Sequence, residues 1–163
     1  MDTKHVYLIA EDDADTQVLV KRAFEQLGIA TPVHFTSDGQ ETIDYLIGYG
    51  RYEDREQFPL PDLLLLDFNM PRADGFAVLD WLRSSRFKEL VVVMFSGTSQ
   101  PRDVKEAYKR GVNSFVEKPM SYHELTQTLM TIHHYWFGCN RLPVSGNGVH
   151  LRKKDGRYKV VPA

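Results

Sequence analysis

Residues 61–75 read PDLLLLDFNMPRADG, a run of four leucines that ends at Asp67. An uninterrupted apolar run of this kind is typical of a strand buried on both faces of a parallel sheet. The stretch therefore predicts a buried strand over Leu63–Leu66 that delivers a carboxylate at its carboxyl end.

Four more short apolar runs lie on either side of this strand, and amphipathic segments separate them from residue 5 to about residue 137. That alternation is typical of a parallel sheet covered by helices, so we predict an α/β domain with an open, doubly wound sheet of five parallel strands. The other predicted strands are Val6–Ala10, Val33–Thr36, Leu90–Phe95 and Ser114–Val116. The apolar faces of the predicted helices are Val20, Phe24 and Leu27; Ile43, Leu46 and Ile47; Val78, Leu79 and Leu82; Val104, Ala107 and Tyr108; and Leu125, Leu129, Ile132 and Trp136.

Three of these helices carry a start signal in the sequence. Asp38 and Glu41 have the spacing of a capping box, as do Ser121 and Glu124, and Asp13 or Asp15 is expected to cap the first helix.

Composition narrows the classes of function. Twenty Lys and Arg against 22 Asp and Glu give a formal net charge of −2, which supplies no overall field for nucleic acid or an anionic membrane. No apolar run approaches the roughly 20 residues of a membrane helix, and carboxylates stand where a signal peptide has its cleavage site, so we expect a cytoplasmic protein. Cys139 is the only cysteine, which excludes an internal disulfide. The histidines lack the spacing of metal ligands, so we expect no metal site built on histidine.

Two segments do not follow the alternation. Residues 48–61 form a long polar connection with bulky aromatics, which is either functional, mobile or a tolerated surface insertion. Residues 144–163 follow the predicted domain of residues 1–143 as a tail that is either disordered or a short hairpin turning at Asp155-Gly156. The tail cations are Arg152, Lys153, Lys154, Arg157 and Lys159, which are either solvated or a small patch for nucleic acid or an acidic partner.

Polar side chains follow four of the predicted strands. Glu11-Asp12-Asp13, Asp67, Ser96 and Lys118 each come where an apolar run stops. In an open parallel sheet these strand ends meet at one edge, where ligands bind. Carboxylates gathered there repel one another unless a cation lies among them, although unrelated caps and solvated charges remain the alternative.

Oxygen ligands at this density suit Mg²⁺, which takes one or two carboxylates together with phosphate oxygens. A carboxylate is ionised at neutral pH, so Asp67 needs no general base to attack phosphorus. The metal and Lys118 would neutralise charge on the transferring oxygens, and Ser96 would donate a hydrogen bond.

These residues resemble the receiver domain of two-component response regulators, over residues 5 to about 137. The motifs that carry the resemblance are Glu11-Asp12, Pro61–Asp67, Asn69-Met70-Pro71, Asp74-Gly75, Phe95-Ser96-Gly97 and Glu117-Lys118-Pro119. The resemblance implies a flavodoxin-like fold with strand order 2-1-3-4-5. It implies Asp67 as the phosphoacceptor and Mg²⁺ held by the carboxylates of Asp12 and Asp67, the Asn69 carbonyl, and Glu11 through water.

The resemblance also implies roles around the phosphoacceptor. Ser96 would be the switch hydroxyl, Lys118 the phosphate-binding ammonium and Phe115 the rotating aromatic. Asn69 and Thr98 would set the lifetime of the phosphoryl group. Lys118-Pro119 would be a cis peptide, as X–Pro bonds allow.

A narrower resemblance is to single-domain regulators partnered with phytochrome-like histidine kinases. It rests on the connection 48–61, on Tyr135-Trp136-Phe137, and on Leu142-Pro143. It implies a two-fold homodimer through the last helix and Leu142-Pro143; the alternative is that this segment folds back over its own helix. We expect Trp136 to continue the buried stripe, with Tyr135 and Phe137 about 100° to either side and one of them exposed.

The function expected is a signalling switch that accepts a phosphoryl group from a histidine kinase or phosphotransfer protein and acts by binding proteins, not an enzyme with its own substrate. A haloacid-dehalogenase-like phosphohydrolase would need a second aspartate two residues after the nucleophile as general acid, and that residue is Asn69. A degenerate receiver would lack at least one of the residues needed for phosphorylation, yet Asp12, Asp67, Ser96 and Lys118 are all present.

Overall fold

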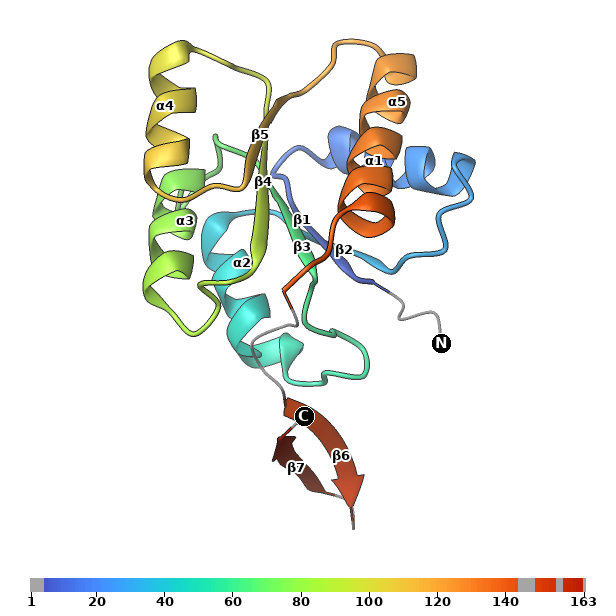
Figure 1. Ribbon diagram of the computed structural model, residues 1–163, viewed down its shortest axis with the longest axis vertical. Helices are drawn as coiled ribbons and strands as arrows, with labels where there is room; N and C mark the ends of the chain where they lie inside the picture. The colour runs from blue at the N-terminus through green and yellow to red at the C-terminus, as the bar shows by residue number, and fades with distance from the viewer. Residues whose placement is uncertain (1–4, 144–148, 155–156, 163) are drawn as a thin grey trace.

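Five parallel strands form the central sheet of the computed structural model, in the order β2-β1-β3-β4-β5 (Figure 1). The structure describes residues 5–143, 149–154 and 157–162, the last two ranges by their backbone. This strand order confirms the predicted doubly wound, flavodoxin-like fold. The strands are β1 Tyr7–Ala10, β2 Val33–Thr36, β3 Leu63–Leu66, β4 Val91–Ser96 and β5 Ser114–Glu117.

Helices cover both faces of the sheet. In Figure 1, α1 and α5 lie on one side of the strands and α2, α3 and α4 on the other. Their bounds are α1 Ala14–Gln26, α2 Gly39–Ile47, α3 Gly75–Ser84, α4 Pro101–Lys109 and α5 Tyr122–His133.

The four leucines of β3 divide between the two cores. Leu64 and Leu66 pack with residues of α2, α3 and α4, whereas Leu63 and Leu65 pack with residues of α1 and α5. Successive side chains of a strand point to opposite faces, so a strand covered on both sides must be apolar at every position. All four leucines are at most 1% exposed.

Side chains at the helix starts behave as the sequence predicts. Asp13 caps α1 by accepting a hydrogen bond from the Thr16 amide at 2.9 Å. Asp38 and Ser121 cap α2 and α5 in the same way, each through the amide three residues on. Glu41 reaches back to the Ser37 amide at 2.6 Å, one residue before the cap.

The connection 48–61 packs into the fold. Tyr52, in the short 3₁₀ segment η1 (Gly50–Tyr52), is 3% exposed and its ring lies 5.0 Å from that of Tyr45. The Arg55 guanidinium donates to the carbonyls of Tyr45, Leu46 and Phe58, which satisfies main-chain oxygens at the end of α2. The connection therefore closes α2 and extends the core.

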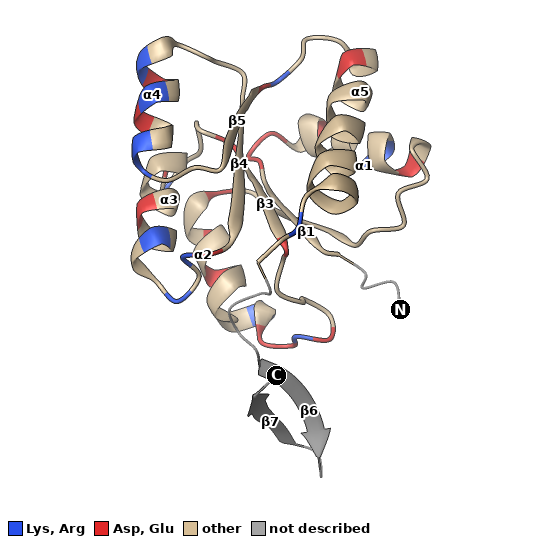
Figure 2. Ribbon diagram, in the orientation of Figure 1, with Lys and Arg blue, Asp and Glu red and all other residues tan. Residues whose placement is uncertain are grey.

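Two residues predicted on buried helix faces are exposed. Tyr108 of α4 is 51% exposed and Ile47 at the end of α2 is 43% exposed. Lys and Arg alternate with Asp and Glu along α4 (Figure 2), and Ala107 is its buried residue. A helix this polar packs on a narrow strip, so an apolar residue at its margin stays in water.

The last helix changes its winding at its end. After His133 the chain forms a π-helical segment, η2, over His134–Cys139. The wider turn brings Phe137 inward, where its ring meets Tyr7 edge-on at 5.0 Å. Trp136 also packs partly against the core, and Tyr135 is 52% exposed. As expected, one of the two aromatics that flank Trp136 is exposed, and it is Tyr135, whereas Phe137 is partly buried.

Strands β6 (Val149–Lys154) and β7 (Arg157–Pro162) pair antiparallel. They occupy the segment for which a hairpin or disorder was predicted, and the Asp155-Gly156 turn lies outside the described residues. Among the helices described, none combines the length and apolar character needed to cross a bilayer.

Candidate functional site

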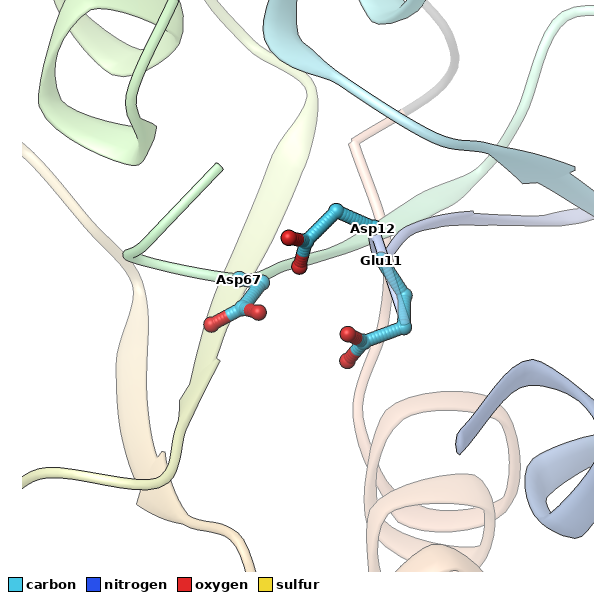
Figure 3. A group of neighbouring side chains, drawn as sticks. All are labelled: Glu11, Asp12 and Asp67. Carbon is cyan, nitrogen blue, oxygen red and sulfur yellow. The ribbon is translucent and has the colours of Figure 1, made fainter. Parts of the chain in front are cut away.

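Three carboxylates gather at the carboxyl edge of the sheet. Glu11 and Asp12 follow β1 and Asp67 follows β3, and one oxygen from each lies within 4.8 Å of the other two. The register explains this, because Ala10 pairs with Leu66 and the Asp67 amide donates to the Ala10 carbonyl at 3.0 Å. Figure 3 shows Glu11 and Asp12 extending from β1 on the side where Asp67 lies.

The ammonium of Lys118 joins this cluster from β5. Its Nζ donates to Asp67 Oδ2 at 3.0 Å and also forms an ion pair with Glu11. The Lys118 amide donates to the Ser96 carbonyl at 2.7 Å, which fixes the start of the loop after β5 against the end of β4. Three strands thus deliver opposite charges to one point.

Burial and charge act against each other here. Burial raises the pKa of the Glu11 carboxyl, and the hydrogen bond and charge of Lys118 offset only part of that rise. Burial lowers the pKa of the Lys118 ammonium, but the hydrogen bonds and charges of Glu11 and Asp67 outweigh it, so this pKa is raised. Lys118 therefore stays a cation at neutral pH.

Ser96 ends β4, the neighbour of β3, and is fully buried. Its hydroxyl lies 3.3 Å from the amide of Thr98 and 3.4 Å from the Thr98 hydroxyl. Thr98 itself is exposed. Phe115 of β5 is half-buried, and its amide donates to the Tyr108 hydroxyl at 3.2 Å.

Asn69 lies in the loop after Asp67 and is exposed. The main-chain amide nitrogen of Asn69 lies 3.4 Å from Asp67 Oδ1. The Lys118–Pro119 peptide is trans, since the described residues contain no cis peptide. The expected cis bond is thus wrong; trans is the isomer of lower free energy for X–Pro, by about 0.5–1 kcal/mol.

The donor set fits a hard divalent cation. Carboxylate oxygens from Glu11, Asp12 and Asp67 are ligands that Mg²⁺ and Mn²⁺ accept. The main chain of Asn69 lies close to the Asp67 carboxylate. Without a cation, Lys118 neutralises part of this charge.

Sequence reasoning missed polar contacts on the loops that flank the site. The Ser99 hydroxyl donates to Glu117 at 2.6 Å, which ties the loop after β4 to β5. Arg72, in the loop after Asp67, forms an ion pair with Asp38. These pairs join residues far apart in the sequence and follow no periodic pattern, so no local signal predicts them.

The model of the response regulator receiver domain family matches residues 7–130. The chain belongs to this family. Receiver domains bind a divalent metal at an acidic pocket and are generally phosphoacceptors rather than enzymes.

Two similar proteins match this chain over most of their own length. The probable methanogenesis regulatory protein FilR2 of Methanothrix harundinacea is 35% identical, over 85% of this chain and 87% of FilR2. The response regulator RPA3017 "in red light signaling" of R. palustris is 33% identical, with a TM-score of 0.81 over 86% of this chain and 99% of that structure.

A solved structure with metal is also similar. The Mn²⁺-bound form of Rcp1, a response regulator of Synechocystis, is 28% identical, with a TM-score of 0.76 over 86% of this chain and 99% of that structure. Solved phytochrome response regulators are among the similar structures as well. These similarities confirm the predicted resemblance to single-domain regulators of that type.

Proposed function

We propose that this receiver domain is a phosphorylation-controlled switch whose Asp67 accepts a phosphoryl group from a histidine kinase or phosphotransfer protein. The observation that carries the proposal is the position of the Asp67 carboxylate, which is bonded by the Lys118 ammonium and within 4.8 Å of two further carboxylates. Phosphoryl transfer depends on positioning and on charge neutralisation, and this site supplies both.

The reaction needs little from the protein beyond these groups. An Asp67 oxygen attacks phosphorus, and an O–P bond forms while the P–N bond of phosphohistidine breaks. The nitrogen that leaves takes the electron pair of that bond, and the other ring nitrogen keeps its proton, so the histidine leaves as neutral imidazole. The Lys118 ammonium, which donates to Asp67 before the transfer, donates to the phosphoryl oxygens during it and neutralises part of their charge. Mg²⁺, held by Asp12, Asp67, the Asn69 carbonyl and Glu11 through water, would neutralise charge on those oxygens.

The response follows from a redistribution of contacts. Phosphorylation adds negative charge and acceptor oxygens at Asp67, and the Ser96 hydroxyl turns to donate to them once the loop after β4 moves inward. That movement gives Phe115 room to rotate. The bistable surface is therefore the face of α4, β5 and α5, and the output is binding of a protein partner.

Two partners are part of the proposed function: a phosphoryl donor and a second copy of the chain. Similar structures include phytochrome response regulators, so we propose a phytochrome-like histidine kinase as the phosphoryl donor. A homodimer through the last helix and Leu142-Pro143 is part of the proposal, because Met130 of α5 and Tyr135 of η2 are 51% and 52% exposed.

Acetyl phosphate tests the function without a cognate kinase. We expect the intact chain to gain the mass of one phosphoryl group in millimolar Mg²⁺, and to gain none in a chelator. A gain at full rate in chelator overturns the proposal. Rapid release of phosphate from simple monoesters, with no labelled chain, would instead favour a phosphohydrolase.

A further inference from the structure

The loop between Asp67 and α3, residues 68–74, packs against the start of α2. A Cβ on Gly39 would lie 2.1 Å from the main-chain oxygen of Ala73, so the contact requires glycine. Next to it, the Arg72 guanidinium forms an ion pair with Asp38. The loop that carries Asn69 is therefore held by a helix that supplies no residue to the site.

Asp38 is a fixed acceptor for this contact. One carboxylate oxygen caps α2 through the Glu41 amide at 2.8 Å, and the other takes the Arg72 hydrogen bond. Burial acts to raise the pKa of Asp38, but the bonds from Arg72 and the Glu41 amide prevail and lower it. The carboxylate side chain is 9% exposed, so its orientation is set by α2 and not by the solvent.

Arg72 has an unusual backbone. Its φ is 65°, and it is the one non-glycine residue with positive φ among those described. The Ala73 amide donates to the Pro71 carbonyl at 2.8 Å across this residue, which makes a tight turn. A side chain disfavours this conformation, so contacts outside the turn must hold it.

The two ends of the loop are fixed at the phosphoacceptor. The Gly75 amide donates to the Phe68 carbonyl at 2.9 Å, and a Cβ on Gly75 would lie 2.6 Å from the Asp67 carbonyl oxygen. Between these ends, the buried side chain of Met70 and the Arg72–Asp38 pair hold the middle. Release of Arg72 would therefore let the Asn69 main chain move relative to Asp67.

We propose that Arg72 is a positioning residue for the phosphorylation site, because its ion pair with Asp38 holds the Asn69 main chain beside Asp67. The inference rests on the proposed function for its purpose, since Asn69 is there a metal ligand. It adds a residue that touches neither the metal nor the phosphoryl group.

Charge alone predicts the opposite effect. Removing a cation near a carboxylate cluster makes the local potential more negative and strengthens binding of a divalent cation. Loss of positioning weakens binding, because the Asn69 carbonyl is no longer held in place. The sign of the change in Mn²⁺ affinity therefore separates the two effects.

The experiment is calorimetric titration of the full chain with Mn²⁺. For Arg72→Gln we expect the dissociation constant to rise about threefold or more, and for Arg72→Lys to return at least halfway to wild type. Arg102→Gln is the matched control, because Arg102 is also exposed but pairs with its neighbour Asp103 and joins no separate segments. Asp38→Asn keeps a good cap, and the Asp38→Asn/Arg72→Gln double variant is expected to be no weaker than Arg72→Gln alone.

Unchanged or tighter Mn²⁺ binding in Arg72→Gln overturns the inference, as does equal weakening in Arg102→Gln. Labelling by acetyl phosphate separates it from the proposed function. A wild-type chain that binds Mn²⁺ but takes no label refutes the proposed function, while the titrations still decide the role of Arg72. A wild-type chain that does not bind Mn²⁺ refutes both.

Discussion

Lys118 Nζ lies 3.0 Å from Asp67 Oδ2 and also pairs with Glu11, so one ammonium joins the ends of β5, β3 and β1. Its side chain is 19% exposed, and those of Glu11 and Asp67 are 4% and 9% exposed. The stability of a fold that buries ions this far from water depends strongly on their pairing. In the proposed function the same cation would also contact the phosphoryl oxygens during transfer.

Lys118→Met should therefore destabilise the protein. It leaves the Glu11 and Asp67 carboxylates side by side without a cation, and we expect a loss of about 1–3 kcal/mol in the free energy of unfolding at pH 7. Millimolar Mg²⁺ should restore more stability to the variant than it adds to wild type. Urea denaturation with and without Mg²⁺ measures this. Lys105→Met on the exposed face of α4 is the control, and an equal effect in both variants would count against the account.

The lifetime of the phosphoryl group is expected to depend on Asn69 and Thr98. Both side chains are exposed, one in the loop after Asp67 and the other in the loop after Ser96, and under the proposed function they would control the approach of water. Asn69→Arg and Thr98→Ala should each change the rate of decay by about twofold or more. Phosphate release after removal of the phosphodonor gives the rate. If neither substitution alters it, these residues do not control hydrolysis.

A dependence on pH follows from His133. Its Nδ1 lies 3.3 Å from the hydroxyl of the buried Tyr7, and burial, with smaller effects from His5 and His134, lowers the pKa of His133. Below the ordinary histidine pKa of about 6.5, the unfolded chain binds this proton more tightly than the folded one. His133 therefore leaves the free energy of unfolding unchanged above that pH and reduces it as the pH falls below that value.

We expect the free energy of unfolding to fall between pH 7.5 and pH 5.5, and to fall less steeply in His133→Gln. Each such histidine contributes at most about 1.4 kcal/mol per pH unit. His34, whose pKa burial also lowers, contributes in the same direction and remains in the variant. His123→Gln on an exposed part of α5 is the control, and a slope reduced equally in both variants would contradict the assignment to His133.

The proposed homodimer is tested on the exposed residues of the last helix. Phe137 is unsuitable, because it stacks on His5 at 4.3 Å and meets Tyr7, so its removal would weaken the fold. Tyr135→Ala/Met130→Ala should shift light scattering at tens of micromolar from dimer to monomer. Leu19→Ala, 40% exposed on α1, should leave the dimer intact. A wild-type chain that is monomeric with and without a phosphoryl mimic excludes the dimer.

The elements that sequence analysis predicts well are those fixed by local pattern. The buried strand Leu63–Leu66 and the caps at Asp38 and Ser121 depend on neighbours within a few residues. The placement of the strand-end charges follows from topology alone, because parallel strands end at one edge. Once the strands are assigned, Glu11 and Asp67 must lie close together.

What could not be predicted depends on partners distant in sequence. The capping of α2 by Arg55 and the pairing of Arg72 with Asp38 join segments whose proximity only the finished fold creates. Phe137 lies in a π-helical segment, which the spacing of apolar residues in the sequence does not predict. Tyr108 was misplaced because the polarity of the whole of α4, and not the spacing of its apolar residues, decides how much of it is covered.

The central claim is that Asp67 carries the phosphoryl group, and chemical trapping tests it most directly. Borohydride reduces an aspartyl phosphate to homoserine, so peptide mass spectrometry after labelling with acetyl phosphate and Mg²⁺ locates the acceptor. The account predicts homoserine at position 67 in the wild type and in Asp62→Asn, and none at any position in Asp67→Asn. Homoserine at another carboxyl, or label that survives Asp67→Asn at the wild-type rate, would contradict it.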